Sequence, residues 1–570
     1  MIYSADFETI TKEPTRVWLW GIVEISDPAN NVMEWGTDIE SFIGRCAAHN
    51  SLMEFFNLKF DGHFIVDWLL KNGYEHVETG MNQRLGKGQF TTLISDMNKF
   101  YSMTVCWLNG HTTEFRDAAK KFPNMSVSVL ARAFKLDISK GDIDYHAERP
   151  IGYQPTEEEL DYLERDVRIV AHALKQTMID NGMRKLTIGA DALNEYKTLI
   201  GKEQFNNLFP VFNQDMDEEI RRAYRGGFTY ADKRFKGTRQ GRGIVLDVNS
   251  LYPFIMYDRL IPYGTPQFVS GKVEPTDRFP LAIFSVTFTA KLKPNHIPCI
   301  QIKGSTIFGA TEYLEEIPEP TTLMVTNVDW QLYQDHYDVE VYAYGGGWRF
   351  KAVKGMFRSY IDKWSKIKAE SEGGQREIAK MFLNSLYGKF ATNPNVTGKI
   401  PVLEDGKVRF VKGKPETRDP VYTAAGVFIT SWARDLTIRA AQANYQHFAY
   451  ADTDSLHLVG DHWEVGEDEN GKPILLNPPE GIRVHPTELG AWKFEYAFEE
   501  AHFVRAKVYL EKKADGSYKT AFAGLPQGVA SKLTFDDLVE GRIIEGKLQP
   551  KSVVGGVVLE NVSFKLNLSG

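Results

Sequence analysis

The feature that most restricts the fold of this chain is an acidic turn between two apolar arms, Phe448-Ala-Tyr-Ala-Asp-Thr-Asp-Ser-Leu-His-Leu-Val459. The alternation in both arms predicts a β-hairpin. A second apolar strand, Gly243-Ile-Val-Leu-Asp-Val248, also carries an acid near its end. We expect Asp247 and Asp454 to face each other across neighbouring strands, with Asp452 beside them. Acids fixed in this way suit Mg²⁺ bound by carboxylates and substrate phosphates, although Asp-Thr-Asp is also common in ordinary turns.

A helix with a cationic face is predicted between these two acidic segments. Its polar residues recur at spacings of four, four and three, which places them on one side of the helix. They are Arg376, Lys380, Asn384 and Tyr387. A separate stripe of Ile378, Phe382 and Leu386 would face the core, and Lys368 on the preceding predicted helix adds another cation. Such a face can pair with a triphosphate, and it also suits an exposed helix without a ligand.

A second set of carboxylates lies in the first third of the chain. Asp6 and Glu8 are two apart in a predicted strand, so their side chains share one face and repel each other unless a divalent metal neutralises them. Tyr162 and Asp166 share one face of a predicted helix. Other acids stand between these motifs, at Asp61, Asp142 and Asp144. Each acid alone is most often a turn former or a surface charge, so only the set carries weight.

Length and charge set wider limits. At roughly 100–200 residues per domain, a chain of 570 residues suggests about three to five domains. The net charge is −8, yet residues 349–399 hold eleven Lys and Arg against four acids, while residues 461–500 hold three against ten. A protein with one basic wall can hold a phosphate backbone despite its net charge. No apolar run reaches about 18 residues, so we expect no membrane contact.

Hydrophobic periodicity predicts the order of the elements. Residues Ile2–Phe7 and Arg16–Ile25 are expected as strands, and Glu157–Met183 as a helix within an α/β unit. Irregular β structure is expected over about 259–355 and again over about 391–424. The helices predicted around these segments are Gly355–Lys368, Gly374–Phe390 and Thr430–Tyr445.

Taken together, the motifs resemble those of known enzymes. Asp6-Phe-Glu8, Asn57-x-x-x-Asp61 and Tyr162-x-x-x-Asp166 are similar in order to the three exonuclease motifs of the DEDD proofreading nucleases. The segments that start at Asp247, Asn384 and Tyr450 resemble motifs A, B and C of the family B DNA polymerases. Lys507-Val-Tyr509 and Tyr224-Arg-Gly-Gly227 resemble two further motifs of that family.

More narrowly, the order and spacing of these segments over nearly the whole chain resemble the protein-primed polymerases of the phi29 type from small Bacillus phages. The resemblance implies an α/β and α+β multidomain fold, in which an RNase H-like 3′–5′ exonuclease domain joins a right-hand polymerase of palm, fingers and thumb with two β-rich insertions. The implied boundaries are 1–186 for the exonuclease, 187–258 and 425–525 for the palm, 259–355 and 391–424 for terminal-protein regions 1 and 2, 356–390 for the fingers, and 526–570 for the thumb.

The resemblance also implies roles in the polymerase site. Asp247, Asp454 and the Val248 carbonyl would hold two Mg²⁺ ions, which Mn²⁺ could replace. Asp452 would lie close by. Tyr252 would stack beneath the incoming sugar and exclude ribonucleotides. The nucleotide contacts would come from Lys368, Arg376, Lys380, Asn384 and Tyr387, and the contacts with DNA from Tyr224, Gly226, Gly227, Lys507 and Tyr509.

In the nuclease site, the resemblance assigns metal binding and catalysis to Asp6, Glu8, Asp61, Asp142 and Asp166, assisted by Lys140 and Tyr162. Asn57, Phe60 and Tyr145 would hold the single-stranded 3′ end, by hydrogen bonding and stacking. The chain departs from the pattern after Asp117, where Ala118 and Ala119 stand in place of Ser-Leu.

The implied function is DNA-directed DNA synthesis with 3′–5′ proofreading, started on a terminal protein and continued with strand displacement to copy a linear phage genome. The implied partners are template-primer and single-stranded DNA, dNTPs and a terminal protein. The enzyme would act as a monomer in the cytoplasm of the infected bacterial host. Four alternatives stay open: an RNA- or DNA-primed family B polymerase, a linear-plasmid polymerase, a nuclease alone, and a DNA-binding replication protein with inactive acidic sites.

Overall fold

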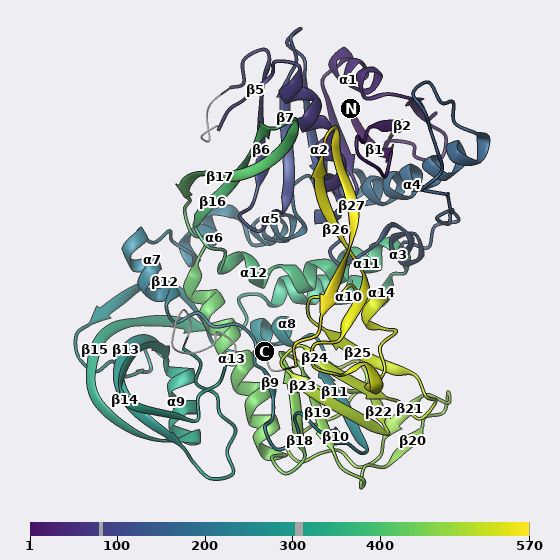
Figure 1. The fold of residues 1–570 in the computed structure, drawn as a ribbon. Coiled ribbons are helices and arrows are strands. Elements are labelled where there is room, and N and C mark those ends of the chain that lie inside the picture. Colours follow the sequence, from purple (N-terminus) through teal and green to yellow (C-terminus); the bar gives the residue numbers. More distant parts are fainter. Residues whose placement is uncertain (79–83, 303–311, 569–570) are drawn as a thin grey trace.

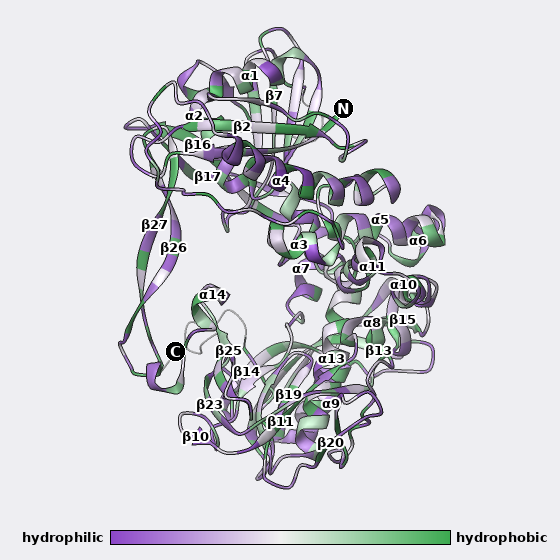
Figure 2. Ribbon diagram, turned by 90° about the vertical axis from the view of Figure 1, so that its right-hand side faces the viewer, coloured by the Kyte–Doolittle hydropathy of each residue, from purple (hydrophilic) through white to green (hydrophobic). Residues whose placement is uncertain are grey.

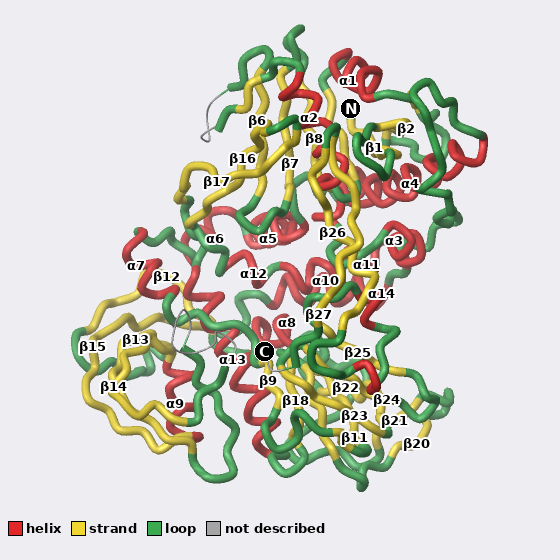
Figure 3. Tube along the Cα trace, viewed as in Figure 1, coloured by secondary structure: helices red, strands yellow, loops and turns green. Residues whose placement is uncertain are grey.

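The computed structural model describes residues 1–78, 84–302 and 312–568 of the chain. In Figure 1 an α/β part formed by the N-terminal residues lies at one end of the molecule, and two sheet-containing parts lie at the other end. Figure 3 shows that helices fill the space between these ends. Among the described residues, no helix combines the length and the apolar content needed to cross a membrane.

The N-terminal part is built on an eight-stranded mixed sheet with the order β3-β2-β1-β4-β8-β7-β6-β5. β1 (Ile2–Thr9) is antiparallel to β2 (Val17–Glu24) and parallel to β4 (Ser51–Phe55). The other strands are β3 (Glu34–Gly36), β5 (Glu75–His76), β6 (Gln89–Ile94), β7 (Phe100–Cys106) and β8 (Thr112–Asp117). The two strands expected near the N-terminus are therefore confirmed.

Helix α4 (Glu157–Leu174) packs against β1 and β2 and positions part of the first acidic set. It begins with a capping box, in which Thr156 and Glu159 satisfy each other's backbone N–H groups. The Ser4 hydroxyl on β1 donates to the Val167 carbonyl at 2.8 Å and fixes the helix against the strand. The predicted helix continues beyond α4 as a π-helical turn, Lys175–Asp180. Helices α1 (Ile39–Ala48), α2 (Leu58–Lys71) and α3 (Val127–Ala133) complete this part.

The predicted acidic hairpin is confirmed at the centre of the second large sheet. Strands β18 (Phe448–Asp452) and β19 (Ser455–Val459) pair antiparallel, and β19 pairs in turn with β11 (Gly243–Val248). The sheet order is β22-β11-β19-β18-β9, with β22 (Trp492–Phe498) and β9 (Thr229–Ala231) at the edges. A four-stranded sheet lies beside it, formed by β10 (Arg239–Gln240), β23 (Glu500–Arg505), β24 (Val508–Lys512) and β25 (Tyr518–Phe522).

The segment expected as irregular β structure over 259–355 is a regular antiparallel sheet with a helix, and residues 303–311 of it lie outside the described residues. Its strands, in the order β12-β15-β13-β14, are β12 (Ile261–Val269), β13 (Leu281–Leu292), β14 (Glu316–Thr326) and β15 (Tyr337–Val353). The helix that the prediction missed is α9 (Asn327–His336), which Thr326 caps. Most of α9 is buried, so its apolar residues show no one-sided helical period.

The middle helices largely follow the prediction. α10 (Arg358–Glu370) and α11 (Gly373–Ser385) are separate, and α11 passes at Leu386 into the short α12 (Tyr387–Phe390). Ile378, Phe382 and Leu386 are buried, as expected of the core-facing stripe. α13 (Thr423–Ala443) begins seven residues earlier than the expected Thr430, because the buried stretch from Thr423 to Thr430 packs as helix. Helices α5 (Ile188–Ile200), α6 (Lys202–Leu208), α7 (Gln214–Arg221) and α8 (Leu251–Asp258) surround them.

Two long hairpins join the ends of the molecule. β16 (Asn395–Glu404) and β17 (Lys407–Thr417) form the β-rich segment expected near 391–424, and β26 (Ile543–Val553) with β27 (Gly556–Lys565) form an arm near the C-terminus. Figure 2 shows this arm reaching toward the N-terminal part. At its tip, Ser552 Oγ lies 2.8 Å from His63 Nε2 and also donates to the Val408 carbonyl. The arm therefore contacts the N-terminal part and the other hairpin together.

Candidate active sites

The first candidate site lies in the second large sheet, where β11, β18 and β19 bring the expected acids together. Asp247 on β11 is the Cα partner of Ser455, the residue that follows Asp454. The Val248 N–H donates to the Asp454 carbonyl at 2.8 Å and ties the two acid-bearing segments to each other. Asp247 and Asp454 therefore meet across neighbouring strands, as the sequence predicts.

Electrostatics shows that these acids act on one another. Burial, and then the charges of Asp454 and Glu495, raise the pKa of Asp247 to about 7. The pKa of Asp454 is raised by burial, then by Asp452 and Glu495. Like charges held together in a partly buried place resist ionisation unless a cation neutralises them. The set thus has the electrostatic character of a cation site.

Glu495 is an acidic residue that the sequence analysis missed. The register of β11 and β22 shifts at this point: Val245 pairs with Tyr496 and Leu246 with Phe494, which leaves Glu495 as an extra residue. Bulges re-aim side chains, often beside active sites. A bulge depends on the pairing of two distant strands, so local alternation along β22 gives no signal of it.

Asp452 has a different partner from the other acids. Its carboxylate accepts from Lys507 Nζ at 2.6 and 2.8 Å and from Thr229 Oγ1 at 3.0 Å. Lys507 is half exposed, and its backbone N–H donates to the Tyr450 hydroxyl at 2.9 Å. Tyr509 packs against the Tyr450 ring, with 4.9 Å between centroids. The structure therefore links the Lys-x-Tyr segment directly to the acidic hairpin.

The segment Tyr224–Gly227 lies against the same acidic turn. A β-carbon on Gly227 would stand 2.8 Å from Thr453 Cγ2, so this position has no room for a side chain, whereas at Gly226 nothing lies within 4 Å. Arg434, a buried residue of α13, donates to the carbonyls of Arg225 and Gly226 at 2.6 and 2.9 Å. The role of Arg434 in holding this segment was not foreseen, because it depends on a contact between residues far apart in the chain.

The cations expected to hold a phosphate gather on α10 and α11. Arg376 donates to the Lys368 carbonyl at 2.6 Å, and Lys380 lies 3.3 Å from Glu377. The pKa of Lys368 is lowered by burial and by the positive charges of Arg376 and Lys380. Asn384 lies exposed at the end of α11. Cations that repel one another at one place form a natural anion-binding site.

Two stacked aromatic rings come from α8, which follows β11 in the chain, and from α12, which follows α11. Tyr252 on α8 and Tyr387 on α12 are stacked, with 3.9 Å between ring centroids and 18° between planes. The pKa of Tyr252 is raised by burial and by the neighbouring Tyr387 and Tyr224. The stack forms a flat apolar wall beside the acids, of the kind that a sugar or a base can rest on.

The second candidate site lies in the N-terminal part, where β1, α2 and α4 bring acids together. Asp6 and Glu8 come from β1, Asp61 from the first turn of α2, and Asp166 from α4. Burial, and then the charge of Asp166, raise the pKa of Asp6 to about 7. The pKa values of Glu8 and Asp61 lie well above their usual range, owing to burial and then to neighbouring acids. Four acids of the predicted set therefore interact.

Lys140 and two tyrosines border this cluster. Lys140 Nζ lies 3.2 Å from Asp166 Oδ2, and the hydroxyls of Tyr145 and Tyr162 are 2.5 Å apart. Asp142 is exposed, and its Oδ1 accepts from the Ile143 N–H at 2.9 Å, so its expected role in metal binding stays a prediction.

The expected single-strand contacts lie at the start of α2. Asn57 is exposed and adopts a left-handed conformation with φ 78°. Its N–H donates to Asp117 Oδ1 at 2.9 Å. Phe60 is partly buried, with its ring 5.7 Å from that of Phe64. Asp117 thus positions Asn57, a role that the sequence analysis did not assign.

Both acid sets fit divalent cations that bind with the help of a substrate. Asp166 Oδ1 and Asp247 Oδ1 are buried and have no hydrogen-bond partner, which is unfavourable unless a cation meets them. Across residues 1–78, 84–302 and 312–568, no three acidic, histidine or cysteine side chains gather closely enough to hold an ion by themselves. Mg²⁺ commonly takes one or two carboxylates and completes its shell with water and substrate phosphates.

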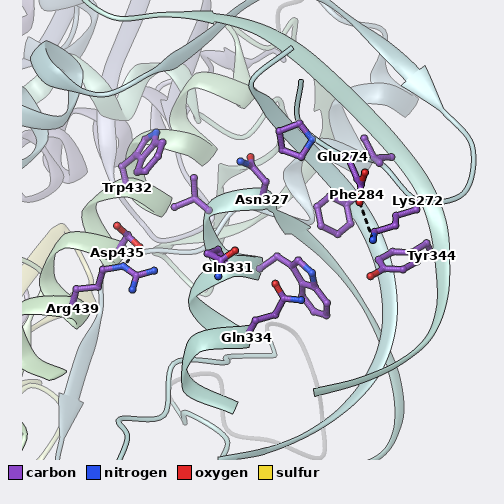
Figure 4. A pocket seen from close by; sticks show the side chains of 14 residues that line it. Lys272, Glu274, Phe284, Asn327, Gln331, Gln334, Tyr344, Trp432, Asp435 and Arg439 are labelled. Carbon is purple, nitrogen blue, oxygen red and sulfur yellow. Dashed lines mark hydrogen bonds and ion pairs between the residues drawn. The ribbon is translucent and has the colours of Figure 1, made fainter. Parts of the chain in front are cut away.

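A pocket of about 500 Å³ lies elsewhere, between α9, α13 and the sheet of residues 261–353. Figure 4 shows its polar and aromatic lining, with the ion pair of Lys272 and Glu274 on one side and that of Asp435 and Arg439 on the other. None of its lining residues belongs to either acidic set. The pocket is therefore separate from both candidate sites.

Comparison with known proteins agrees with this geometry. A family model described as "DNA polymerase type B, organellar and viral" matches residues 146–468. The DNA polymerases of Bacillus phage Nf and Bacillus phage phi29 are each 40% identical over 592 aligned positions, which cover 99% of both chains. The DNA polymerase of Streptococcus phage Cp-1 is 30% identical over 593 positions, covering 99% of this chain and 98% of its own.

Solved structures give the same result. Phi29 DNA polymerase complexed with primer-template DNA and incoming nucleotide substrates has a TM-score of 0.90 and 39% identity, covering 99% of this chain and 100% of that one. The same polymerase complexed with single-stranded DNA has a TM-score of 0.88 and 38% identity over the same shares. The expected fold, an exonuclease domain joined to palm, fingers and thumb, is thereby confirmed. The chain belongs to the phi29-type DNA polymerases of the type B family.

Proposed function

We propose that this DNA polymerase uses two separate acidic sites, one that extends DNA and one that removes nucleotides from the 3′ end. The observation that carries the first role is the meeting of Asp247 and Asp454 beside the cationic face of α10 and α11. The second role is supported by the cluster of Asp6, Glu8, Asp61 and Asp166 in a different part of the molecule. The domain boundaries expected from the sequence are part of this proposal.

In the polymerase site, Asp247, Asp454 and the Val248 carbonyl would hold two Mg²⁺ ions, and Mn²⁺ could replace them. When bound, these ions would lower the pKa of the attacking hydroxyl and neutralise charge on the triphosphate. Lys368, Arg376 and Lys380 bind the phosphates, and Asn384 lies at the end of the same face. Positioning and charge neutralisation account for most of the rate in phosphoryl transfer.

The aromatic wall selects the nucleotide. Tyr252 lies under the sugar, where a 2′-hydroxyl would collide with its ring, and Tyr387 contacts the nascent base pair. Lys507 and Tyr509 grip the primer strand, while Tyr224, Gly226 and Gly227 guide the template between the two sites. Lys507 leaves its ion pair with Asp452 when a DNA phosphate offers a closer anion, because half-exposed ion pairs are weak.

In the exonuclease site, the four clustered acids and Asp142 would hold the metal ions, and Tyr162 would orient the attacking water. Its hydroxyl is held by Tyr145, which limits the positions that it can take. Lys140 compensates the charge of Asp166 before the substrate arrives. Asn57 and Phe60 receive the single-stranded 3′ end, by hydrogen bonding and stacking.

We further propose that synthesis starts on a hydroxyl of a terminal protein and proceeds with strand displacement in the cytoplasm of an infected bacterium. The two hairpins support the second property. The arm β26–β27 and the hairpin β16–β17 touch at Ser552 and Val408, so they can surround DNA without a separate clamp. A deletion of Asn393–Thr417 should therefore shorten the products on a long template, and unchanged product lengths would argue against this role.

Primer extension on a primed single-stranded circle, with Mg²⁺ and four dNTPs, tests the two-site proposal. Asp454→Ala should lose extension and still degrade the primer, whereas the double substitution Asp6→Ala/Glu8→Ala should do the reverse. Products longer than the circle would demonstrate strand displacement. If the wild type only degrades the primer at every dNTP concentration, the polymerase proposal is wrong. Incubation with a terminal protein and one labelled dNTP tests protein priming separately.

A further inference from the structure

Lys493 lies directly beside the polymerase acids. It is the Cα partner of Asp247 in the antiparallel pair β11–β22. Residues directly opposite each other in such a pair project to the same face, with β-carbons roughly 4.5–5.5 Å apart. The ammonium of Lys493 is therefore held within a side-chain length of the Asp247 carboxylate.

The bulge in β22 places a second acid next to the same ammonium. Lys493 Nζ lies 3.6 Å from Glu495 Oε1, and the two side chains are 37% and 30% exposed. Glu495 in turn acts on both Asp247 and Asp454. An ion pair this long and this exposed contributes little to stability. Lys493 is thus held loosely, and a stronger anion can draw it away from Glu495.

Lys493 also faces the cations of the fingers. Lys493 lowers the pKa of Lys368, as Arg376 and Lys380 on α11 do, although it approaches from the palm sheet. Positive groups that approach one point from two sides of a site repel each other until an anion lies between them. Lys493 is thus close to Asp247 and Glu495 and also within electrostatic reach of Lys368, so a triphosphate bound by both groups would come within reach of its ammonium.

We propose that Lys493 is a palm-side ligand of the triphosphate of the incoming nucleotide and of the pyrophosphate that leaves. In the free enzyme its ammonium pairs with Glu495. When the nucleotide enters, the ammonium donates to the phosphate oxygens from the side opposite to Lys368, Arg376 and Lys380. This inference rests on the proposed polymerase site and adds a phosphate contact from a different element.

The competing explanation is that Lys493 only neutralises Asp247 and Glu495. The two explanations differ in the ligand whose binding depends on the lysine. If Lys493 binds phosphate, its substitution lowers the affinity for dNTP and for pyrophosphate. If Lys493 only neutralises the acids, its substitution changes the Mg²⁺ concentration and the pH that extension requires, and the affinity for nucleotide stays the same.

The test compares Lys493→Met, Lys493→Gln and Lys493→Arg with the wild type, with Lys472→Met as the control at an exposed lysine. The dissociation constant of the correct dNTP is measured by gel shift, on a template-primer ended with a dideoxynucleotide and with Ca²⁺ in place of Mg²⁺. We expect both neutral variants to bind dNTP about tenfold more weakly, and Lys493→Arg and Lys472→Met to bind like the wild type. Pyrophosphorolysis should require a similarly higher pyrophosphate concentration in the neutral variants.

Two controls make the result decisive. Degradation of a single-stranded oligonucleotide by the exonuclease site shows that each variant is folded. Because two different neutral substitutions are made, the result does not depend on a local effect of either one. Unchanged affinities for dNTP and pyrophosphate, together with a changed Mg²⁺ requirement or pH optimum, would overturn the inference. If the wild type itself adds no nucleotide, the proposed function fails instead, which is a different outcome.

Discussion

The side chain of Thr453 occupies the space that a β-carbon on Gly227 would need, with Thr453 Cγ2 only 2.8 Å from that position. Thr453 lies between Asp452 and Asp454, and its N–H donates to the Phe228 carbonyl at 2.7 Å. The segment proposed to guide the template and the turn that carries the catalytic acids are therefore in direct contact. Any change in one of them displaces the other.

The first prediction concerns Gly227→Ala. The added methyl group should push the Thr453 side chain and the acidic turn apart, since overpacking of this kind costs typically 1–3 kcal/mol. We expect a loss of primer extension of at least about tenfold, with degradation of single-stranded DNA unchanged. The measurement is extension and degradation by the same preparation.

Gly241→Ala is the matched control, because a β-carbon there meets nothing within 4 Å. The double substitution Gly227→Ala/Thr453→Gly should recover extension, since Thr453 has φ 56°, which glycine adopts without strain. If the double variant is as impaired as Gly227→Ala, the contact with Thr453 is not the cause.

A second prediction follows from the raised pKa values of the acids. The pKa of Asp247 and that of Asp6 are each raised to about 7, whereas an aspartate in an unfolded chain titrates at about 4. Between these values the folded protein holds more protons than the unfolded chain, so stability falls as pH rises. In EDTA, we expect the midpoint of thermal unfolding to fall between about pH 4 and pH 7.

Mg²⁺ should reverse part of this loss at pH 7, because it compensates the ionised acids. Asp247→Asn removes one of the titrating groups and should flatten the pH dependence of the unfolding midpoint in EDTA. A midpoint that rises from pH 4 to pH 7 in the metal-free wild type would contradict the sign of the effect.

The third prediction concerns Asp117, which accepts from the Asn57 N–H and is 2% exposed. Asp117→Ala should release Asn57 from its left-handed conformation and raise the KM of the exonuclease for single-stranded DNA about tenfold, with a smaller effect on kcat. Asp117→Asn keeps an oxygen acceptor at this position and should behave more like the wild type. Primer extension with dNTPs serves as the control. An equal loss of both activities in Asp117→Ala would indicate general unfolding instead of a positioning role.

The sequence was sufficient for the elements whose pattern is local. The arms of the hairpin Phe448–Val459 alternate, the strand that ends near Asp247 is a short apolar run, and their pairing was expected from the acids at their ends. The core stripe of Ile378 and Phe382 also follows from spacing alone. These elements carry Asp247, Asp452 and Asp454, so the meeting of these acids could be predicted from the sequence without knowledge of the whole fold.

What the sequence did not show depends on contacts between distant segments. The bulge at Glu495 exists only in the pairing of β11 with β22, and Asp117 meets Asn57 across 60 residues of chain. Helix α9 was missed because its buried positions lie on several sides. The metal-binding role expected of Asp142 rests on the family resemblance alone and stays a prediction, because Asp142 lies in a segment without helix or strand.

The last prediction concerns the buried ion pair of Asp329 and Arg434, which links α9 to the segment Tyr224–Gly227 that we propose guides the template. Arg434 Nη2 donates to Asp329 Oδ2 at 2.7 Å, and Ser431 Oγ donates to the same oxygen at 3.0 Å. Asp329→Ala leaves Arg434 buried without its counter-charge, a change that typically costs 3–5 kcal/mol. We expect a lower midpoint of thermal unfolding and weaker extension, because Arg434 also holds the carbonyls of Arg225 and Gly226.

Asp335→Ala provides a close control for this substitution. Asp335 lies on the same helix and pairs with Arg439 of α13 at 2.9 Å, but these side chains are 39% and 44% exposed. An exposed pair contributes only about 0–1 kcal/mol, so Asp335→Ala should leave both the unfolding midpoint and extension close to those of the wild type. Equal effects of the two substitutions would mean that burial of the Asp329–Arg434 pair is not what makes it important.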